Sequence, residues 1–251
     1  MTWQVVAVVV GLLGVAVGVP VGRWLRQGTY RKPDEEAMAL PGTRWWVAPA
    51  LGVVWAALTW RLLAAAPATG AGPVLDPGVS PGSHGPAQFL AWVTLLAVAV
   101  ACVCLAAMDL DVHRLPDRVM WPTLGLLGAG LALAALASGE WQVLGRFLLA
   151  GFACGVGYLA LALLSLARGS LALGLGDVKL AVVLGAALGW FGWQSVVLGM
   201  YAGFLVGGLI ALVLLATRRI GLRGDLAYGP PMMIGALIGV LLAPDSLSAM
   251  F

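Results

Sequence analysis

Two aspartates at the ends of long apolar runs are the residues best suited to chemistry. Asp109 follows the apolar run 87–108, and Asp177 precedes the apolar run 178–191. An ionisable group at a membrane boundary is costly to bury and is usually functional. Two carboxyl groups that lie close together cannot both ionise easily, so such a pair shares a proton. One member then acts as general base on a water while the other polarises a peptide carbonyl. If the chain brings them together, these aspartates predict a protease dyad.

The elements that must position these aspartates are membrane helices. Only 10% of the 251 residues are charged and the mean hydropathy is +0.99, whereas a soluble domain carries about a quarter charged residues. Several continuous apolar runs reach about 20 residues, the length of a membrane span, and their continuity argues against a β-barrel. We expect an all-α, polytopic membrane helical bundle of about eight transmembrane helices. The expected spans are 3–21, 45–66, 87–108, 119–137, 143–167, 178–191, 196–217 and 228–242.

The positive charges predict how these spans are oriented. Lysine and arginine concentrate in cytoplasmic loops. If the loops after the first, third, fifth and seventh spans are cytoplasmic, they account for every basic residue except Arg61 and Arg146. Those two lie near the outer ends of apolar runs, where long side chains can snorkel. Both termini are then outside. Two complete spans separate Asp109 from Asp177, so both return to the cytoplasmic edge and could meet inside the bundle.

An outer loop rich in proline and glycine divides the chain. Residues 1–86 are expected to form an N-terminal two-span region with a short basic cytoplasmic loop. Residues 87–251 are expected to form a six-span core that contains both aspartates. The three cysteines lie inside apolar runs without CxxC spacing, which argues against a zinc site and a disulfide framework. We expect neither a metal nor a cofactor.

Position alone leaves other roles open for these acids. Asp177 would serve equally well as the N-cap of the sixth helix. Asp117 follows Pro116 and precedes an apolar run, which favours capping of the fourth helix. Lys179 is expected to snorkel or to pair with an acid.

A cluster around the first aspartate leaves a second chemistry open. Asp109, Asp111, His113 and Asp117 could together hold a divalent metal. A Mg²⁺-dependent membrane transferase acting on lipid-linked phosphates is therefore an alternative function. A non-enzymatic transporter or assembly factor with a polar path through the two aspartates is another.

Three segments resemble, in order, the landmarks of the type IV prepilin peptidase family, the GxGD-type aspartic membrane proteases. The stretch MDLDVHRLPD at 108–117 resembles the family's pattern of an aspartate followed by Leu-Pro-Asp. The stretch GLGDVKL at 174–180 looks like its GxGD segment, and YGPP at 228–231 is similar to its C-terminal landmark.

The resemblance implies an aspartic endopeptidase of the inner membrane that removes the short basic leader of type IV prepilins and pseudopilins at the cytoplasmic face. Asp109 and Asp177 would be its catalytic pair. The supporting residues that the resemblance implies are Gly174, Gly176, Lys179, Asp111, Asp117, Gly229 and Pro230. The implied partners are a precursor with a basic leader and a hydrophobic N-terminal helix, and the lipid bilayer, but no nucleic acid. The aspartates of the two motifs would attract the basic leader.

One departure from the family pattern concerns a second activity. Many members carry two CxxC pairs after the first span and also methylate the new N-terminus. The corresponding segment here, 22–44, is short and contains no cysteine. The zinc site of those members is therefore absent, and methyltransferase activity stays open.

Overall fold

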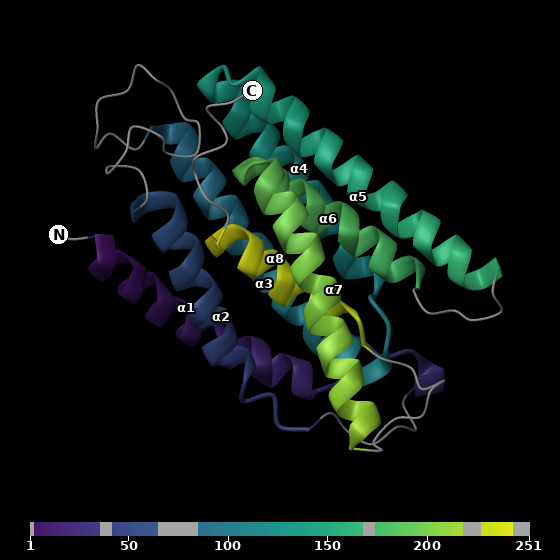
Figure 1. Cartoon of the computed structure of the whole chain (residues 1–251). Helices are drawn as coiled ribbons and strands as arrows, with labels where there is room; N and C mark the ends of the chain where they lie inside the picture. The colour runs from purple at the N-terminus through teal and green to yellow at the C-terminus, as the bar shows by residue number, and fades with distance from the viewer. Residues whose placement is uncertain (1–2, 36–41, 65–84, 168–173, 218–226, 243–251) are drawn as a thin grey trace.

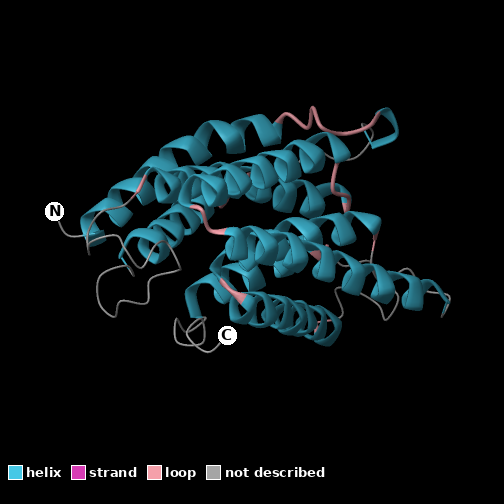
Figure 2. Ribbon diagram, turned by 90° about the horizontal axis from the view of Figure 1, so that it is seen from above, coloured by secondary structure: helices cyan, strands magenta, loops and turns pink. Residues whose placement is uncertain are grey.

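The computed structural model describes residues 3–35, 42–64, 85–167, 174–217 and 227–242, and these form a bundle of eight α-helices (Figure 1). The helices are α1 Trp3–Arg26, α2 Val47–Thr59, α3 Pro86–Val112, α4 Asp117–Ser138, α5 Trp141–Ala167, α6 Leu175–Phe191, α7 Trp193–Ala216 and α8 Gly229–Leu242. A π-helical turn, Trp60–Ala64, continues α2, and a short 3₁₀ helix spans Pro33–Glu35. The described residues contain no strand (Figure 2).

The bundle has the composition of a multi-pass membrane protein. Among the described helices, α1, α3, α4, α5 and α7 are long and apolar enough to cross a membrane. A helix is suited to this because it satisfies its backbone hydrogen bonds internally. Helices α2, α6 and α8 are shorter. The prediction of a polytopic all-α membrane bundle is confirmed.

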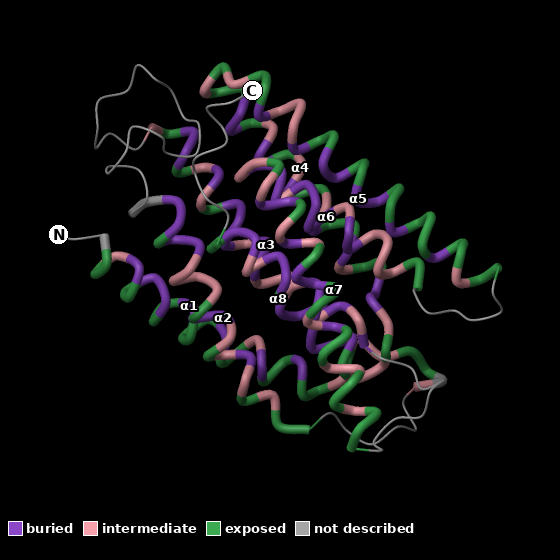
Figure 3. Tube along the Cα trace, in the orientation of Figure 1, coloured by how far each residue is buried: buried purple, intermediate pink, exposed green. Residues whose placement is uncertain are grey.

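Three helical hairpins make up most of the bundle, and α3 lies between the first and the third of them. Helices α1 and α2, α5 and α6, and α7 and α8 form the closest pairs, while α3 contacts α1, α2, α4 and α8. Figure 3 shows the buried backbone concentrated in α3, α6 and α8. Glycines let α7 and α8 approach closely, since a Cβ at Gly239 would lie 2.6 Å from the Cα of Gly199. Small residues at helix contacts are typical of membrane bundles.

Two arginines cap short helices at the end of the bundle where α2 ends. The Arg61 Nε donates to the carbonyl of Val240 at 3.0 Å, and the Arg146 Nε donates to that of Gly189 at 2.7 Å. The prediction that Arg61 and Arg146 snorkel is therefore wrong. Helices α8 and α6 end there and leave carbonyls without helical partners, and a cation at a helix C-terminus also complements the helix dipole.

The helix ends differ from the sequence prediction at three places. Helix α3 continues beyond Asp109, so the expected loop 109–118 shrinks to the four residues before α4. His113 ends the helix in a left-handed conformation (φ 49°), and its N–H returns to the carbonyl of Asp109 at 2.9 Å. Helix α6 begins at Leu175, and the turn before α7 falls on Gly192 (φ 133°) rather than on the two residues after it. Most of the outer loop and the whole basic segment 218–225 lie outside the described residues.

Candidate active site

Asp109 occupies the last turn of α3, where a backbone N–H from α8 holds it. Its side chain is buried, with 4% of the residue exposed. The N–H of Gly229 donates to its Oδ2 at 2.9 Å. A Cβ at position 229 would lie only 2.8 Å from the same oxygen. The first residue of α8 therefore has to be glycine for this contact to form, and Pro230 follows it in the first helical turn, where proline is tolerated.

Asp177 occupies the first turn of α6. Its Oδ2 accepts the N–H of Gly174 at 3.0 Å, and Gly174 is the extended N-cap residue of the helix (φ −82°, ψ 158°). This is one half of a capping box, in which the third helical residue caps the first free N–H. The cap starts α6 three residues earlier than predicted. Gly176 lies against the segment that joins α3 to α4, because a Cβ there would be 3.2 Å from the Cβ of Leu115.

The two carboxyl groups lie at the same end of the bundle and interact electrostatically. Burial is the larger influence on the Asp177 carboxyl, and the charge of Asp109 is a smaller one. Among the described residues, neither carboxyl forms an ion pair. Asp177 can therefore cap α6 and interact with Asp109 at the same time. One of its carboxylate oxygens accepts the N–H of Gly174, and the charge of Asp109 still influences the group.

An aromatic group beside Asp177 was not predicted from the sequence. The rings of Tyr158 and Phe204 stack at 5.3 Å, and the ring of Tyr228 lies 6.0 Å from that of Phe204. The charge of Asp177 acts on both tyrosines. Both hydroxyls are buried and lie close enough to influence each other, but neither forms a well-aligned hydrogen bond within the described parts of the chain. The sequence offers one signal for this aromatic group, which is a tyrosine inside an apolar run. A buried tyrosine hydroxyl usually has a hydrogen-bond partner, so such a residue indicates a polar neighbour.

Asp111 is bound by three groups from the segment that follows α1. Its Oδ2 accepts the Tyr30 hydroxyl at 2.7 Å and the Arg31 Nε at 2.9 Å. Its Oδ1 pairs with Arg31 Nη2 at 2.9 Å and with Arg44 Nη2 at 3.4 Å. Only 9% of the Asp111 side chain is exposed. Residues two apart on a helix point to different faces, so Asp111 is directed away from Asp109 and fastens the N-terminal segment to α3.

Asp117 and Lys179 link the starts of α4 and α6. The Lys179 Nζ lies 2.6 Å from the Asp117 Oδ1 and 5.6 Å from the centroid of the Trp121 ring. Of the two roles expected for Lys179, snorkelling or pairing with an acid, the structure shows the pairing. The prediction that Asp117 caps α4 is wrong, because Pro116 is the N-cap and no side chain caps this helix. Lys179 offers a charge-assisted bond that competes better for the carboxylate.

Comparison with known proteins identifies the stretch that carries both aspartates. Residues 96–215 match the type IV leader peptidase family. Over this stretch, called the leader peptidase domain below, the chain is similar to that family. The match includes Asp109 and Asp177 and ends before Gly229. The leader peptidase domain thus contains the last turn of α3 and the start of α6.

Several relatives of the leader peptidase domain carry the name prepilin leader peptidase/N-methyltransferase. The protein from Pseudomonas putida is 32% identical over 59% of this chain and 49% of its own length. That from Pectobacterium carotovorum subsp. carotovorum is 33% identical over 60% and 51%. That from Dickeya chrysanthemi is 35% identical over 61% and 54%. The chain thus spans about half the length of the curated relatives it matches. No solved structure matches the chain.

The aspartates of the two leader peptidase motifs do not form one acidic cluster, because Asp111 and Asp117 pair with cations. Arg31 and Arg44 neutralise Asp111, and Lys179 neutralises Asp117. No group of three or more histidine, cysteine, aspartate or glutamate side chains in the described ranges has the geometry of a metal site. The four acids of the two motifs therefore do not act as one negative surface, and of these four only Asp109 and Asp177 form no ion pair with a described residue.

Proposed function

We propose that the chain is a membrane-embedded aspartic endopeptidase that removes the basic leader of type IV prepilins or pseudopilins with Asp109 and Asp177. The proposal is supported by the position of both carboxyl groups at one end of the bundle, by the electrostatic influence of Asp109 on Asp177, and by the similarity of this stretch to leader peptidases. Each group accepts one backbone N–H through its Oδ2. The other oxygen of each accepts no hydrogen bond from a described residue, so it is available to water or substrate.

The pair would hydrolyse a peptide bond by moving one proton at a time. The ionised carboxylate accepts a proton from water as the water oxygen attacks the carbonyl carbon. The protonated carboxyl donates a hydrogen bond to the carbonyl oxygen, on which negative charge develops. When the C–N bond breaks, a carboxyl proton passes to the leaving nitrogen. The pair then holds one proton again, which is the state that two neighbouring carboxyl groups favour.

The end of the bundle that carries the pair would face the cytoplasm, with both termini outside and the protein in the inner membrane. The positive-inside rule supports this orientation. Basic side chains gather near the described loops and helix ends on the side of the pair. They are Arg23, Arg26, Arg31, Lys32, Arg44, Arg114, Arg118 and Lys179.

The substrate would approach this end with its hydrophobic helix in the bilayer and its basic leader in the cytoplasm. Because Asp111 and Asp117 are paired with cations, the leader's charge would be attracted chiefly by Asp109 and Asp177. The glycines of the GxGD segment support close approach of an extended chain, since Gly174 lies in extended backbone and Gly176 carries no side chain. No nucleic acid takes part.

The chain would be organised as a two-span region, residues 1–86, attached to a six-span peptidase core, residues 87–251. The family match starts at residue 96, which supports this division. The contacts of Tyr30, Arg31 and Arg44 with Asp111 would attach the first region to the core beside the catalytic pair.

A cleavage assay with a chelator tests this function. Purified protein in lipid vesicles is incubated with a type IV prepilin, and leader removal is followed by gel mobility with and without EDTA. Cleavage that persists in EDTA is expected for an aspartic dyad, whereas loss of cleavage in EDTA, or no cleavage at all, would contradict the proposal. The mass of the mature N-terminus in the same assay, with S-adenosylmethionine added, reports whether a methyl group is transferred.

A further inference from the structure

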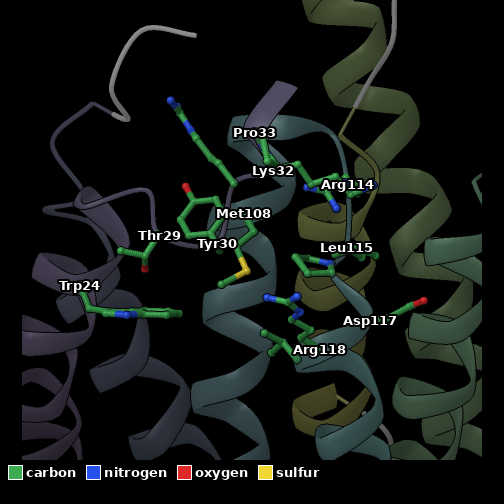
Figure 4. A pocket seen from close by; sticks show the side chains of 13 residues that line it. Trp24, Thr29, Tyr30, Lys32, Pro33, Met108, Arg114, Leu115, Asp117 and Arg118 are labelled. Atoms are coloured by element: carbon green, nitrogen blue, oxygen red, sulfur yellow. The ribbon is translucent and has the colours of Figure 1, made fainter. Parts of the chain in front are cut away.

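A cavity of about 630 Å³ lies between the segment that follows α1 and the segment that joins α3 to α4 (Figure 4). Figure 4 shows Trp24 and Tyr30 toward one side of it and Arg118 toward the other. Its size is in the range of small-molecule sites. Neither catalytic aspartate lines it. The cavity is therefore a separate feature at the same end of the bundle.

The walls of the cavity carry an excess of positive charge. Its basic residues are Arg31, Lys32, Arg114 and Arg118, and its one acidic residue is Asp117. Asp111 neutralises Arg31, Glu35 neutralises Arg114 and Lys179 neutralises Asp117.

Two cations remain after these pairs are formed. Lys32 and Arg118 form no ion pair with any residue that the structure describes. A basic leader peptide would be repelled here, whereas an anion would be attracted.

Arg114 is a second indication that the cavity suits an anion. Its terminal Nη2 is bound to Glu35 at 2.6 Å, but its Nε is buried and has no hydrogen-bond partner in the described part of the chain. An unsatisfied buried donor is unfavourable, and more so when it belongs to a charged group. An oxygen of a bound anion would satisfy it.

The remaining walls of the cavity suit a lipid. Trp24, at the end of α1, is 42% exposed and its ring lies 6.4 Å from that of Tyr30. Tryptophan and tyrosine are enriched where a membrane meets water. Met108 and Val119 add apolar surface on the side of α3 and α4. A ligand with a phosphate and an acyl chain would match both the basic and the apolar walls.

We propose that this cavity binds the phosphate of an anionic phospholipid of the adjacent leaflet through Lys32, Arg114 and Arg118. Guanidinium groups suit phosphate because they donate in a fork that matches its oxygens. The bound headgroup would join the segment after α1 to the start of α4. Leu115 lines the same cavity and packs against Gly176, next to Asp177, so the lipid would also stabilise the segment that borders the catalytic pair.

Native mass spectrometry of the full chain in neutral detergent tests this site. Phosphatidylglycerol, phosphatidylcholine and inorganic phosphate are the three probes. The double variant Lys32→Gln/Arg118→Gln removes the two unpaired cations. The matched control Arg23→Gln/Arg26→Gln removes two exposed charges near the same end of α1 that do not line the cavity. The single variant Lys32→Gln is the fallback if the double variant fails to fold.

The expected result is one phosphatidylglycerol bound in preference to phosphatidylcholine. Its affinity should fall about tenfold in the double variant, from the loss of two charge contacts, by a smaller factor in Lys32→Gln, and less than about twofold in the control. Equal losses in the double variant and the control would mean general attraction to a basic surface and would overturn the proposal. Saturation by inorganic phosphate without retention of phosphatidylglycerol would overturn the lipid as the ligand.

Discussion

The backbone N–H of Gly229 donates to the Oδ2 of Asp109 at 2.9 Å and so joins the first residue of α8 to the last turn of α3. This hydrogen bond connects residues 120 positions apart in the chain. It fixes the orientation of a buried carboxyl group that forms no ion pair with a described residue. The first prediction concerns this contact.

Gly229→Ala should reduce cleavage without unfolding the protein. The new Cβ would lie 2.8 Å from the Asp109 Oδ2 and would displace the carboxyl group. Misplacement of a catalytic group by about 1 Å can reduce turnover by about 100-fold. Gly208→Ala is the matched control, because a Cβ there meets no atom within 4 Å. Initial rates of leader removal check the prediction, and equal rates for the two variants would contradict it.

Asp111→Asn should destabilise the protein far more than Asp117→Asn. The Asp111 side chain is 9% exposed, accepts hydrogen bonds from Tyr30 and Arg31 and pairs with Arg44, and a hydrogen bond to a charged group contributes about 1.5–3 kcal/mol. The Asp117 side chain is 59% exposed in its pair with Lys179, and an exposed pair contributes at most about 1 kcal/mol. Thermal unfolding in detergent measures both changes. Similar stability of the two variants would show that Asp111 does not hold the N-terminal segment in place.

Tyr228→Phe should leave stability unchanged or slightly raised, whereas Tyr30→Phe should lower it. The Tyr228 hydroxyl is buried, and its only influence among the described hydroxyls is a poorly aligned one with Tyr158, so its removal loses no well-formed hydrogen bond. The Tyr30 hydroxyl donates to Asp111 at 2.7 Å, and a hydrogen bond to a charged group contributes about 1.5–3 kcal/mol. The same unfolding measurement compares the two variants. A large loss in Tyr228→Phe would reveal a partner for this hydroxyl.

Glu35→Gln should lower stability at neutral pH but not in acid. Burial raises the pKa of the Glu35 carboxyl, but the Lys32 N–H and the Arg114 guanidinium outweigh this effect and hold the pKa below its ordinary value of 4.5. A carboxyl whose pKa is lowered by folding contributes stability that is present above its unfolded pKa and lost as the pH falls through its folded pKa. The difference in melting temperature between wild type and Glu35→Gln should therefore shrink below pH 4.5. A difference that persists unchanged in acid would contradict this account.

The arrangement of the helices was predictable because it depends on periodicity and length. Continuous apolar runs marked each helix, and an even number of crossings between Asp109 and Asp177 predicted that both lie at one end of the bundle. For Lys179 the sequence left two roles open, snorkelling or pairing with an acid, and the structure shows the pair with Asp117.

The tertiary partners were not predictable because several side chains were equivalent candidates in the sequence. Nothing in the order of the basic residues singled out Arg31 and Arg44 as the partners of Asp111. Arg146 lies near the end of an apolar run, where a snorkelling arginine is expected. Only the neighbouring end of α6 makes it a cap. Tyr158 is one of several aromatic residues in the apolar helix α5, and only packing places it beside Asp177.

The most direct test of the catalytic pair is the single-turnover rate of prepilin cleavage by Asp109→Asn and Asp177→Asn. Both changes preserve the size of the side chain and its ability to accept a backbone N–H, so both variants should fold as wild type does. Each should lose at least about 1,000-fold in rate, because a general acid or base contributes about 100- to 10,000-fold. Lys179→Gln, which removes a charge near Asp177 without touching either carboxyl group, should retain most of the rate. Cleavage at the wild-type rate by both asparagine variants would show that Asp109 and Asp177 are not the catalytic pair.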